Sequence, residues 1–231
     1  MTQYWLGDPH FGHIKVAELR GFSTTDEHDD FLMEQLSVIR EDDTIYFMGD
    51  LSSGRDAAAD RALELISTLK GTKHLLAGNH DPVSSIHKNG WKSQKRYLEV
   101  FDSVRDYGRF SMEREVVLMS HFPYAAIGDG DGRVGPPRYL AYRLADSGHP
   151  MIHAHTHQSH PFSKMREDTI TKIELEGYDM NSMCVSWDAR RGLTTDSDVS
   201  KWLEVRALVK KNQETERVRN YWGAFPKPTT V

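Results

Sequence analysis

Short apolar runs alternate with amphipathic stretches through the first part of the chain. The apolar runs end at glycine or run directly into polar loop residues, which is typical of short buried strands. The amphipathic stretches carry apolar side chains at helical spacing, and Thr24 followed by Glu27 predicts a capping box at the start of the first. We therefore predict strands over residues 3–6, 45–48 and 74–77 and helices over residues 24–40 and 56–70.

The second part of the chain is richer in strand-like patterns. Alternating or β-branched runs predict strands over residues 104–110, 116–119, 151–154, 169–175 and 183–187. Helical patterns cover residues 91–101, 140–145 and 198–211, and glycine and proline mark residues 123–138 as a surface loop. Strands and helices mixed in this order predict an α/β fold with mixed sheets.

The length of 231 residues suits one large domain. We expect that domain over residues 1–211, followed by a polar tail over residues 212–231. Tyr221, Trp222 and Phe225 are too apolar for a free coil, so we expect the tail to pack on the body or on a second subunit. A homo-oligomer is therefore left open.

Composition excludes several classes of protein. Hydrophobic residues make up 38% and charged residues 27% of the chain, as in ordinary globular proteins. No apolar run approaches the length of about 20 residues that spans a bilayer, and the N-terminus resembles no signal peptide. With a single cysteine, Cys184, we expect a cytoplasmic protein without a membrane partner. The net charge of −5 argues against a surface that grips duplex nucleic acid as a whole.

Five of the predicted strands end in clusters of Asp, Asn or His. Side chains gather at the carboxyl ends of strands in α/β folds, so we expect these clusters to meet. Mixed oxygen and imidazole ligands suit Mn²⁺, Fe²⁺, Zn²⁺ or Co²⁺ better than Ca²⁺. There are too many candidates for one ion, and the number suits two ions if one carboxylate bridges them. The candidate ligands are Asp8, His10, Asp50, Asn79, His121, His155 and His157.

In this order the clusters resemble the motifs of the calcineurin-like metallophosphoesterases. The series is Asp-x-His, Gly-Asp, Gly-Asn-His-Asp, His and His-x-His, and it spans residues 7–157. The opening Gly-Asp-Pro-His-Phe-Gly-His is similar to that of small bacterial and phage members. Ala154 stands where the family usually has glycine. The resemblance implies a four-layer sandwich of two mixed β-sheets flanked by helices.

The resemblance also implies a role for each residue. Asp50 would bridge two divalent transition metal ions, with Mn²⁺ favoured and Fe, Zn, Co and Ni left open. His80 would face the scissile phosphate, and Asp81 would orient His80. His13 is a candidate for substrate binding, although it could equally only hydrogen-bond the first loop. Asp8, His10 and His157 would hold one ion, and Asn79, His121 and His155 the other.

The implied function is hydrolysis of phosphodiesters by a hydroxide that bridges the two ions. The substrate would be a small phosphodiester or a nucleotide, with 2′,3′-cyclic nucleotides among the candidates. A phosphomonoesterase is an alternative, as is a nuclease that acts on RNA or DNA ends. A protein that is not an enzyme, a scaffold that keeps the fold for binding, is a further alternative, and it would predict the loss of a metal ligand or of His80. The sequence keeps all seven candidate ligands and His80.

Overall fold

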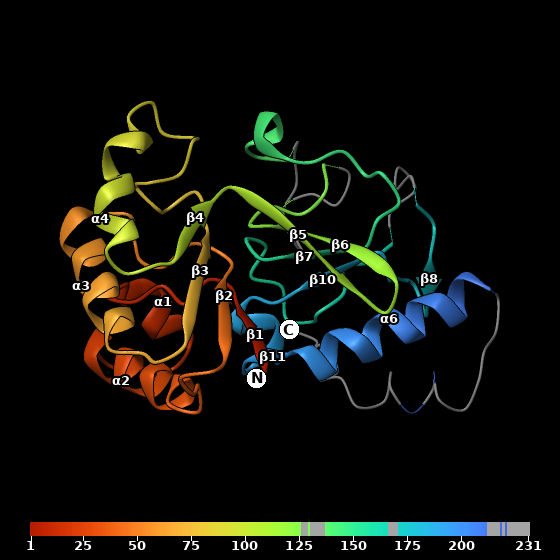
Figure 1. The fold of residues 1–231 in the computed structure, drawn as a ribbon, viewed down its shortest axis with the longest axis horizontal. Coiled ribbons are helices and arrows are strands. Elements are labelled where there is room, and N and C mark those ends of the chain that lie inside the picture. The colour runs from red at the N-terminus through yellow and green to blue at the C-terminus, as the bar shows by residue number, and fades with distance from the viewer. Residues whose placement is uncertain (126–128, 130–136, 166–170, 212–217, 219, 221–231) are drawn as a thin grey trace.

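Two β-sheets lie face to face between helices in the computed structural model (Figure 1), which describes residues 1–125, 129, 137–165, 171–211, 218 and 220. The first sheet has the strand order β11-β1-β2-β3-β4. Strands β1 to β4 pair in parallel, and β11 is antiparallel to β1. Its strands are β1 (Gln3–Leu6), β2 (Thr44–Phe47), β3 (Thr72–Leu76), β4 (Ser103–Arg105) and β11 (Thr194–Thr195).

The second sheet has the order β10-β7-β6-β5. Strand β7 is parallel to both β6 and β10, whereas β5 and β6 form an antiparallel hairpin. A separate small hairpin joins β8 (Glu174–Leu175) and β9 (Tyr178–Asp179). The strands of the second sheet are β5 (Tyr107–Met112), β6 (Glu115–Ser120), β7 (Met151–His153) and β10 (Ser182–Cys184).

Helices flank the two sheets. Figure 1 shows α1 to α4 on one side of the first sheet and α6 beside the second. The α-helices are α1 (Ile14–Leu19), α2 (Thr25–Leu36), α3 (Asp56–Ser67), α4 (Gln94–Leu98), α5 (Trp187–Arg190) and α6 (Asp196–Lys210), and the 3₁₀ helices are η1 (Gly90–Ser93) and η2 (Leu140–Tyr142).

Strands β1, β2 and β3 of the first sheet send alternate side chains into two separate cores. In β1, Trp5 packs with Val117 and Ile152 of the second sheet, whereas Leu6 packs with Leu32 of α2. Successive side chains of a strand point to opposite faces, so the first sheet is covered by helices on one face and by the second sheet on the other. The layered α/β sandwich predicted from sequence is confirmed.

The structure differs from the predicted elements mainly where segments are short. Helix α2 ends at Leu36, four residues earlier than predicted, and the predicted helix over 140–145 is a single 3₁₀ turn. The predicted strand over 104–110 is two strands: β4 ends just before Asp106, and β5 begins just after it. Helices α1 and α5 were not predicted, because six and four residues carry too little periodicity.

Parts of three predictions lie outside the described residues. These are most of the loop over 123–138, the first two residues of the strand over 169–175 and nearly all of the tail over 212–231. In the described part of that strand, only Glu174–Leu175 form a strand, β8. Within the tail, Val218 is described and buried in the core that contains Trp5. The described residues include no helix long and apolar enough to cross a membrane.

Trp202 of α6 offers a test of the core between the sheets. Its side chain is fully buried, and its Nε1 donates a hydrogen bond to the carbonyl oxygen of Met180 at 2.9 Å. We expect Trp202→Ala to lower the free energy of unfolding by about 3–5 kcal/mol in urea titrations with metal chelated. Lys201→Ala, at the exposed neighbouring position, should change it by less than about 0.5 kcal/mol. A loss for Trp202→Ala as small as the control would contradict this packing.

Candidate metal centre

All the loops that carry candidate ligands leave the carboxyl ends of parallel strands. Asp8 follows β1, Asp50 follows β2, and Asn79 follows β3 in the first sheet. His121 follows β6, and the pair His155 and His157 follows β7 in the second sheet. Parallel neighbours end at the same edge, so the two facing sheets bring these loops together.

The loops hold five of the ligand candidates in an unusual backbone conformation. A positive φ is strained for residues other than glycine, by about 1–3 kcal/mol each. Such strain persists only where the surroundings fix it, and it concentrates at functional sites. The five residues are Asp8 (φ 53°), His10 (55°), Asp50 (55°), His155 (70°) and His157 (48°).

Small residues let the loops approach this closely. A Cβ at Gly78 would lie 2.3 Å from Oδ1 of Asp50, and one at Gly49, itself at φ +90°, would lie 2.5 Å from the backbone nitrogen of Gly78. A Cβ at Gly7 would lie 2.4 Å from that of Ala154. The alanine at position 154 is therefore compatible with the fold because Gly7 faces it.

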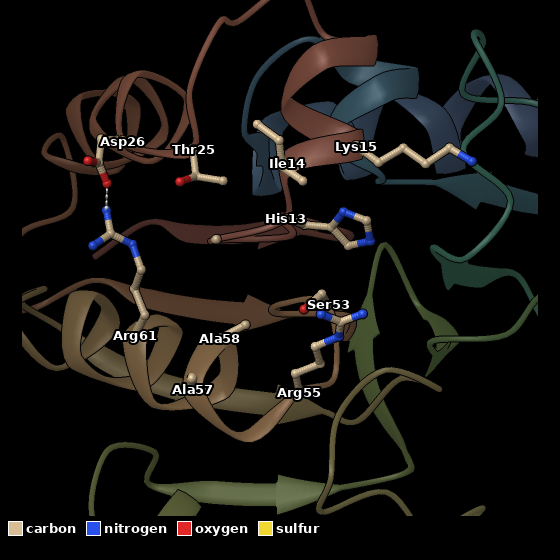
Figure 2. A pocket seen from close by; sticks show the side chains of 11 residues that line it. His13, Ile14, Lys15, Thr25, Asp26, Ser53, Arg55, Ala57, Ala58 and Arg61 are labelled. Atoms are coloured by element: carbon tan, nitrogen blue, oxygen red, sulfur yellow. Dashed lines mark hydrogen bonds and ion pairs between the residues drawn. The ribbon is translucent and has the colours of Figure 1, made fainter.

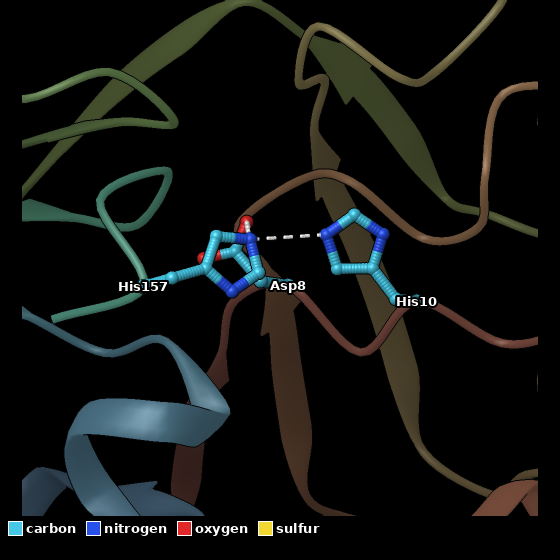
Figure 3. Close-up of side chains that lie close together, drawn as sticks. All are labelled: Asp8, His10 and His157. Carbon is cyan, nitrogen blue, oxygen red and sulfur yellow. Dashed lines mark hydrogen bonds and ion pairs between the residues drawn. The ribbon is translucent and has the colours of Figure 1, made fainter. Parts of the chain in front are cut away.

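Asp8, His10 and His157 form the first of two groups that could hold a metal ion (Figure 3). The Nε2 atoms of His10 and His157 lie 3.1 Å apart, and Nε2 of His157 lies 3.9 Å from Oδ1 of Asp8. Asp8 is fully buried, and its Oδ2 accepts the backbone N–H of His155 at 2.9 Å. Its Oδ1 has no hydrogen-bond partner among the described residues.

Asp50, His121 and His155 form the second group, and all three are buried. Nε2 of His121 lies 3.5 Å from Oδ1 of Asp50 and 3.2 Å from Oδ1 of Asn79. Nε2 of His155 is buried and has no hydrogen-bond partner among the described residues. The structure therefore brings together all seven ligand candidates in two adjoining groups.

Asp50 lies between the two groups. Its Oδ1 faces His121, while its Oδ2 lies 3.9 Å from Nε2 of His10 in the first group. Burial, only partly offset by His121, raises the pKa of Asp50 to about 6. The group is still a carboxylate near neutral pH, and its two oxygens point to different groups, as a bridging ligand requires.

Each of three histidines commits Nδ1 to an oxygen and turns Nε2 toward the ligands. Nδ1 lies 3.0 Å from the Ser52 carbonyl oxygen in His10 and 2.7 Å from that of Met48 in His121. In His157 it lies 2.6 Å from Oδ2 of Asp188. These oxygens can only accept, so Nδ1 carries the proton and a neutral ring presents its Nε2 lone pair.

When all four histidines are neutral, as ligands must be, lone pairs face one another at both groups. In a neutral His121 the Nε2 lone pair meets the Oδ1 acceptor of Asn79, and the buried Oδ1 of Asp8 and Nε2 of His155 lack hydrogen bonds among the described residues. Buried acceptors that face each other without a donor are costly. Two cations would satisfy them, so the donor set fits a dinuclear site for metals that accept oxygen and nitrogen ligands.

A proton links the first group in the absence of metal. Burial, and then the charges of His157 and Arg20, hold the pKa of His10 well below its usual range. Burial would also lower the pKa of His157, but the charges of Asp8 and Asp188 raise it to about 9. Protonated His157 therefore donates Nε2–H to neutral His10 across the 3.1 Å contact.

Asp188 and Arg20 support this group, and the sequence analysis named neither. Arg20 donates from Nε and Nη2 to the two oxygens of Asp188, each at 2.9 Å. It also donates to the carbonyl oxygens of Asp8, at 2.8 Å, and Pro9, at 2.9 Å. Although burial alone would raise it, hydrogen bonds from His157 and Arg20 hold the pKa of Asp188 below its usual range. No sequence motif marks either residue.

His80 lies in the cleft beside the two groups. The cleft has a volume of 560 Å³, and His80, Asp50 and Asn79 line it together. The His80 backbone N–H donates to Oδ1 of Asp50 at 2.7 Å, and its Nδ1 lies 3.2 Å from the Ser53 carbonyl oxygen. With Nδ1 committed to that carbonyl, Nε2 is the ring atom available to a substrate.

The predicted role of Asp81 is wrong, because its carboxylate does not contact the His80 ring. Asp81 is fully buried and accepts backbone N–H groups from Gly78 at 2.7 Å, Asp50 at 2.9 Å and Leu51 at 3.0 Å. The carbonyl of Ser53 takes the position expected for Asp81. Asp81 therefore joins the two loops that carry Asp50 and Asn79.

His13 lies at the edge of the cleft, one ring beyond His10. It is the N-cap of α1, and its side chain accepts the N–H of Val16 at 3.4 Å. Its ring centroid lies 5.3 Å from that of His10 and 6.5 Å from that of His80. The structure thus shows the local hydrogen bond and also a position open to the cleft.

Asp129 approaches the second group from the long surface loop and was not expected. Its Oδ1 lies 3.5 Å from Nε2 of His155. Arg138 donates from Nε to Oδ2 of Asp129 at 2.8 Å, and Arg143 pairs with the other oxygen. Arg138 also lines the cleft. An aspartate in a glycine-rich loop gives no sequence signal of this contact.

The pKa of His157 predicts how metal affinity depends on pH. A ligand histidine must be neutral, so Mn²⁺ has to displace the proton of His157 below about pH 9. The affinity of the chain for Mn²⁺, measured by calorimetry without oxygen, should rise up to tenfold per pH unit from about pH 7 to pH 8. Asp188→Asn should weaken Mn²⁺ binding about 10–100-fold and flatten this slope. Asp42→Asn, at an exposed carboxylate, should change neither. An unchanged slope in Asp188→Asn would contradict the assignment.

Comparison with known proteins agrees with this geometry. The sequence model of the calcineurin-like phosphoesterase family matches residues 1–181. The Gene 66 protein of Mycobacterium phage L5 is 35% identical over 167 residues, which cover 68% of this chain and 78% of the phage protein. The Gene 66 protein of Mycobacterium phage D29 is 33% identical over 164 residues, covering 68% and 79%.

A solved structure of a protein of unknown function from Aquifex aeolicus has a similar fold. Its TM-score is 0.57 at 20% identity, and the match covers 87% of this chain and 98% of the other. The likeness between the two structures concerns the fold alone. The family assignment comes from the sequence matches, and the chain belongs to the calcineurin-like phosphoesterases, a family of metal-dependent hydrolases of phosphate esters.

Proposed function

We propose that this protein is a dinuclear metal-dependent phosphodiesterase. The observation that carries the proposal is the position of Asp50 between two groups of ligand side chains, with His80 beside them in one cleft. Two cations about 3.5–4 Å apart would clamp a phosphate and lower the pKa of bound water enough to supply hydroxide near neutral pH. The mixed oxygen and imidazole donors suit Mn²⁺, Fe²⁺, Zn²⁺ and Co²⁺, and Mn²⁺ is the ion that we propose.

His80 supports hydrolysis of diesters. A diester with an alkoxide leaving group needs a proton at the departing oxygen, and a positioned acid is typically worth about 10²–10⁴-fold in rate. Nδ1 of His80 is held by the Ser53 carbonyl, so Nε2 is the atom that would donate that proton. The His80 backbone N–H fixes Asp50 at the same time, which keeps the acid at a set distance from the ligands.

A hydrolysis panel with added Mn²⁺ tests the proposal. It would compare an aryl phosphodiester, an aryl phosphomonoester, 2′,3′- and 3′,5′-cyclic nucleotides, and short RNA and DNA. We expect turnover of diesters, including 2′,3′-cyclic nucleotides, that Asp50→Asn abolishes and Asp42→Asn does not change. Turnover of monoesters alone would contradict the proposal and indicate a phosphatase. Turnover of RNA or DNA alone would instead indicate a nuclease. No turnover of any substrate with any metal would indicate a non-catalytic scaffold.

The leaving group reports on His80. His80→Ala should lower kcat about 10²–10⁴-fold for a cyclic nucleotide, whose leaving alkoxide needs a proton. It should lower kcat much less for a p-nitrophenyl diester, because nitrophenolate is a stable leaving group that departs without a proton. His149→Ala, at an exposed histidine, is the matched control and should leave both rates unchanged. An equal loss on both substrates would rule out proton donation by His80.

A further inference from the structure

A second pocket adjoins the metal cleft and is not used by the proposed reaction. It has a volume of 640 Å³ and lies between the start of α1, the first turn of α2 and the first turns of α3 (Figure 2). None of the seven candidate ligands lines it. The pocket is therefore a separate recess rather than a part of the metal centre.

The two recesses are continuous at His13 and Lys15, which line both. The His13 ring lies 5.3 Å from the ring of His10, centroid to centroid. A molecule whose phosphate lies on the metal centre can therefore extend past His13 into the second pocket. The pocket would therefore receive the part of the substrate that is attached to the scissile phosphate.

Two unpaired cationic side chains line the pocket. Its one acidic lining residue, Asp26, pairs with Arg61 at 2.8 Å, and Arg61 also binds the buried Asp29 at 2.6 Å. The side chains of Arg55 and Lys15 have no hydrogen bond or ion pair to another described residue. Because Arg61 binds both Asp26 and Asp29, these two side chains are the cations of the lining whose charge is unpaired.

Arg55 is well placed to meet an anion. It directly precedes α3, and Figure 2 shows its side chain extending toward Ser53 and His13. A guanidinium presents a planar set of donors that matches two oxygens of a phosphate.

The remaining walls are apolar or small. Ile14 is 49% exposed where it lines the pocket, and Ala57 and Ala58 form the wall on α3. A surface of this kind suits a sugar, which presents carbon atoms between its polar groups. An apolar wall beside a cationic end fits a sugar that carries a phosphate.

We propose that this pocket binds a second phosphate of the substrate, held by Arg55. The inference rests on the proposed phosphodiesterase activity and defines its substrate class. The substrate is a nucleoside phosphodiester that carries a further phosphate on the same sugar, as at the end of a nucleic acid strand. A cyclic nucleotide with no second phosphate fills the metal cleft and leaves the pocket unused.

A matched pair of substrates tests this inference. The p-nitrophenyl ester of thymidine 5′-phosphate has the same scissile bond with or without a 3′-phosphate. In the wild-type protein with Mn²⁺, the 3′-phosphate should lower KM about tenfold or more. Arg55→Ala should abolish this gain and leave kcat/KM for the ester without the 3′-phosphate within about twofold. Arg55→Lys should keep part of the gain.

Arg40→Ala is the control for loss of one surface arginine. Arg40 is exposed and precedes β2, at the edge of the sheet opposite to the ligand loops, so the KM gain should persist. The inference is overturned if the 3′-phosphate does not lower KM in the wild type. It is also overturned if Arg55→Ala keeps the gain or lowers kcat/KM equally for both esters.

A binding measurement separates this inference from the proposed function. Thymidine 3′,5′-bisphosphate and thymidine 5′-phosphate would be titrated into the wild type and Arg55→Ala by calorimetry, with metal present and with metal chelated. In the wild type, the bisphosphate should bind about tenfold more tightly than thymidine 5′-phosphate. In Arg55→Ala, the two ligands should bind with equal affinity. Equal affinities in the wild type would overturn the pocket assignment. Failure to hydrolyse either ester would instead overturn the phosphodiesterase and leave the binding result to decide the pocket.

Discussion

The arrangement of the metal centre depends on the hydrogen bonds that the buried carboxylate of Asp81 accepts. It accepts three backbone N–H groups, from Gly78 in the loop after β3 and from Asp50 and Leu51 in the loop after β2. One short side chain therefore fixes the two loops that carry Asp50 and Asn79. Burial raises the pKa of Asp81, while these hydrogen bonds favour its ionised form. Removing the carboxylate would leave three buried donors without an acceptor.

The loops must be held because their conformation is strained. Five ligand candidates have a positive φ, and two of them, His10 and His157, bring their Nε2 atoms within 3.1 Å of each other. Hydrogen bonds from outside the ligand set offset this cost. Arg20 binds the carbonyl of Asp8 and also Asp188, which in turn holds His157. The ligands are thus in place before metal binds, which is how preorganised sites avoid reorganisation when they act.

Local patterns in the sequence predicted the mixed α/β fold and the candidate ligands, and the family resemblance implied the layered sandwich. Each ligand lies within a few residues of a strand end, so the end of an apolar run marks it. Asp188 and Asp129 could not be predicted, because each reaches its histidine across the fold from a segment with no motif. The role of Asp81 was wrong for a related reason. Its neighbour in sequence is His80, but the backbone turn directs its carboxylate to the N–H groups behind the loop.

Electron paramagnetic resonance of the Mn²⁺-loaded protein tests the central claim most directly. If Asp50 bridges two ions, the chain should take up two Mn²⁺ with a multiline spectrum from exchange-coupled ions. Two ions held by separate groups would instead give the six-line spectrum of isolated Mn²⁺. That spectrum, or uptake of a single ion per chain, would contradict a dinuclear centre built around Asp50.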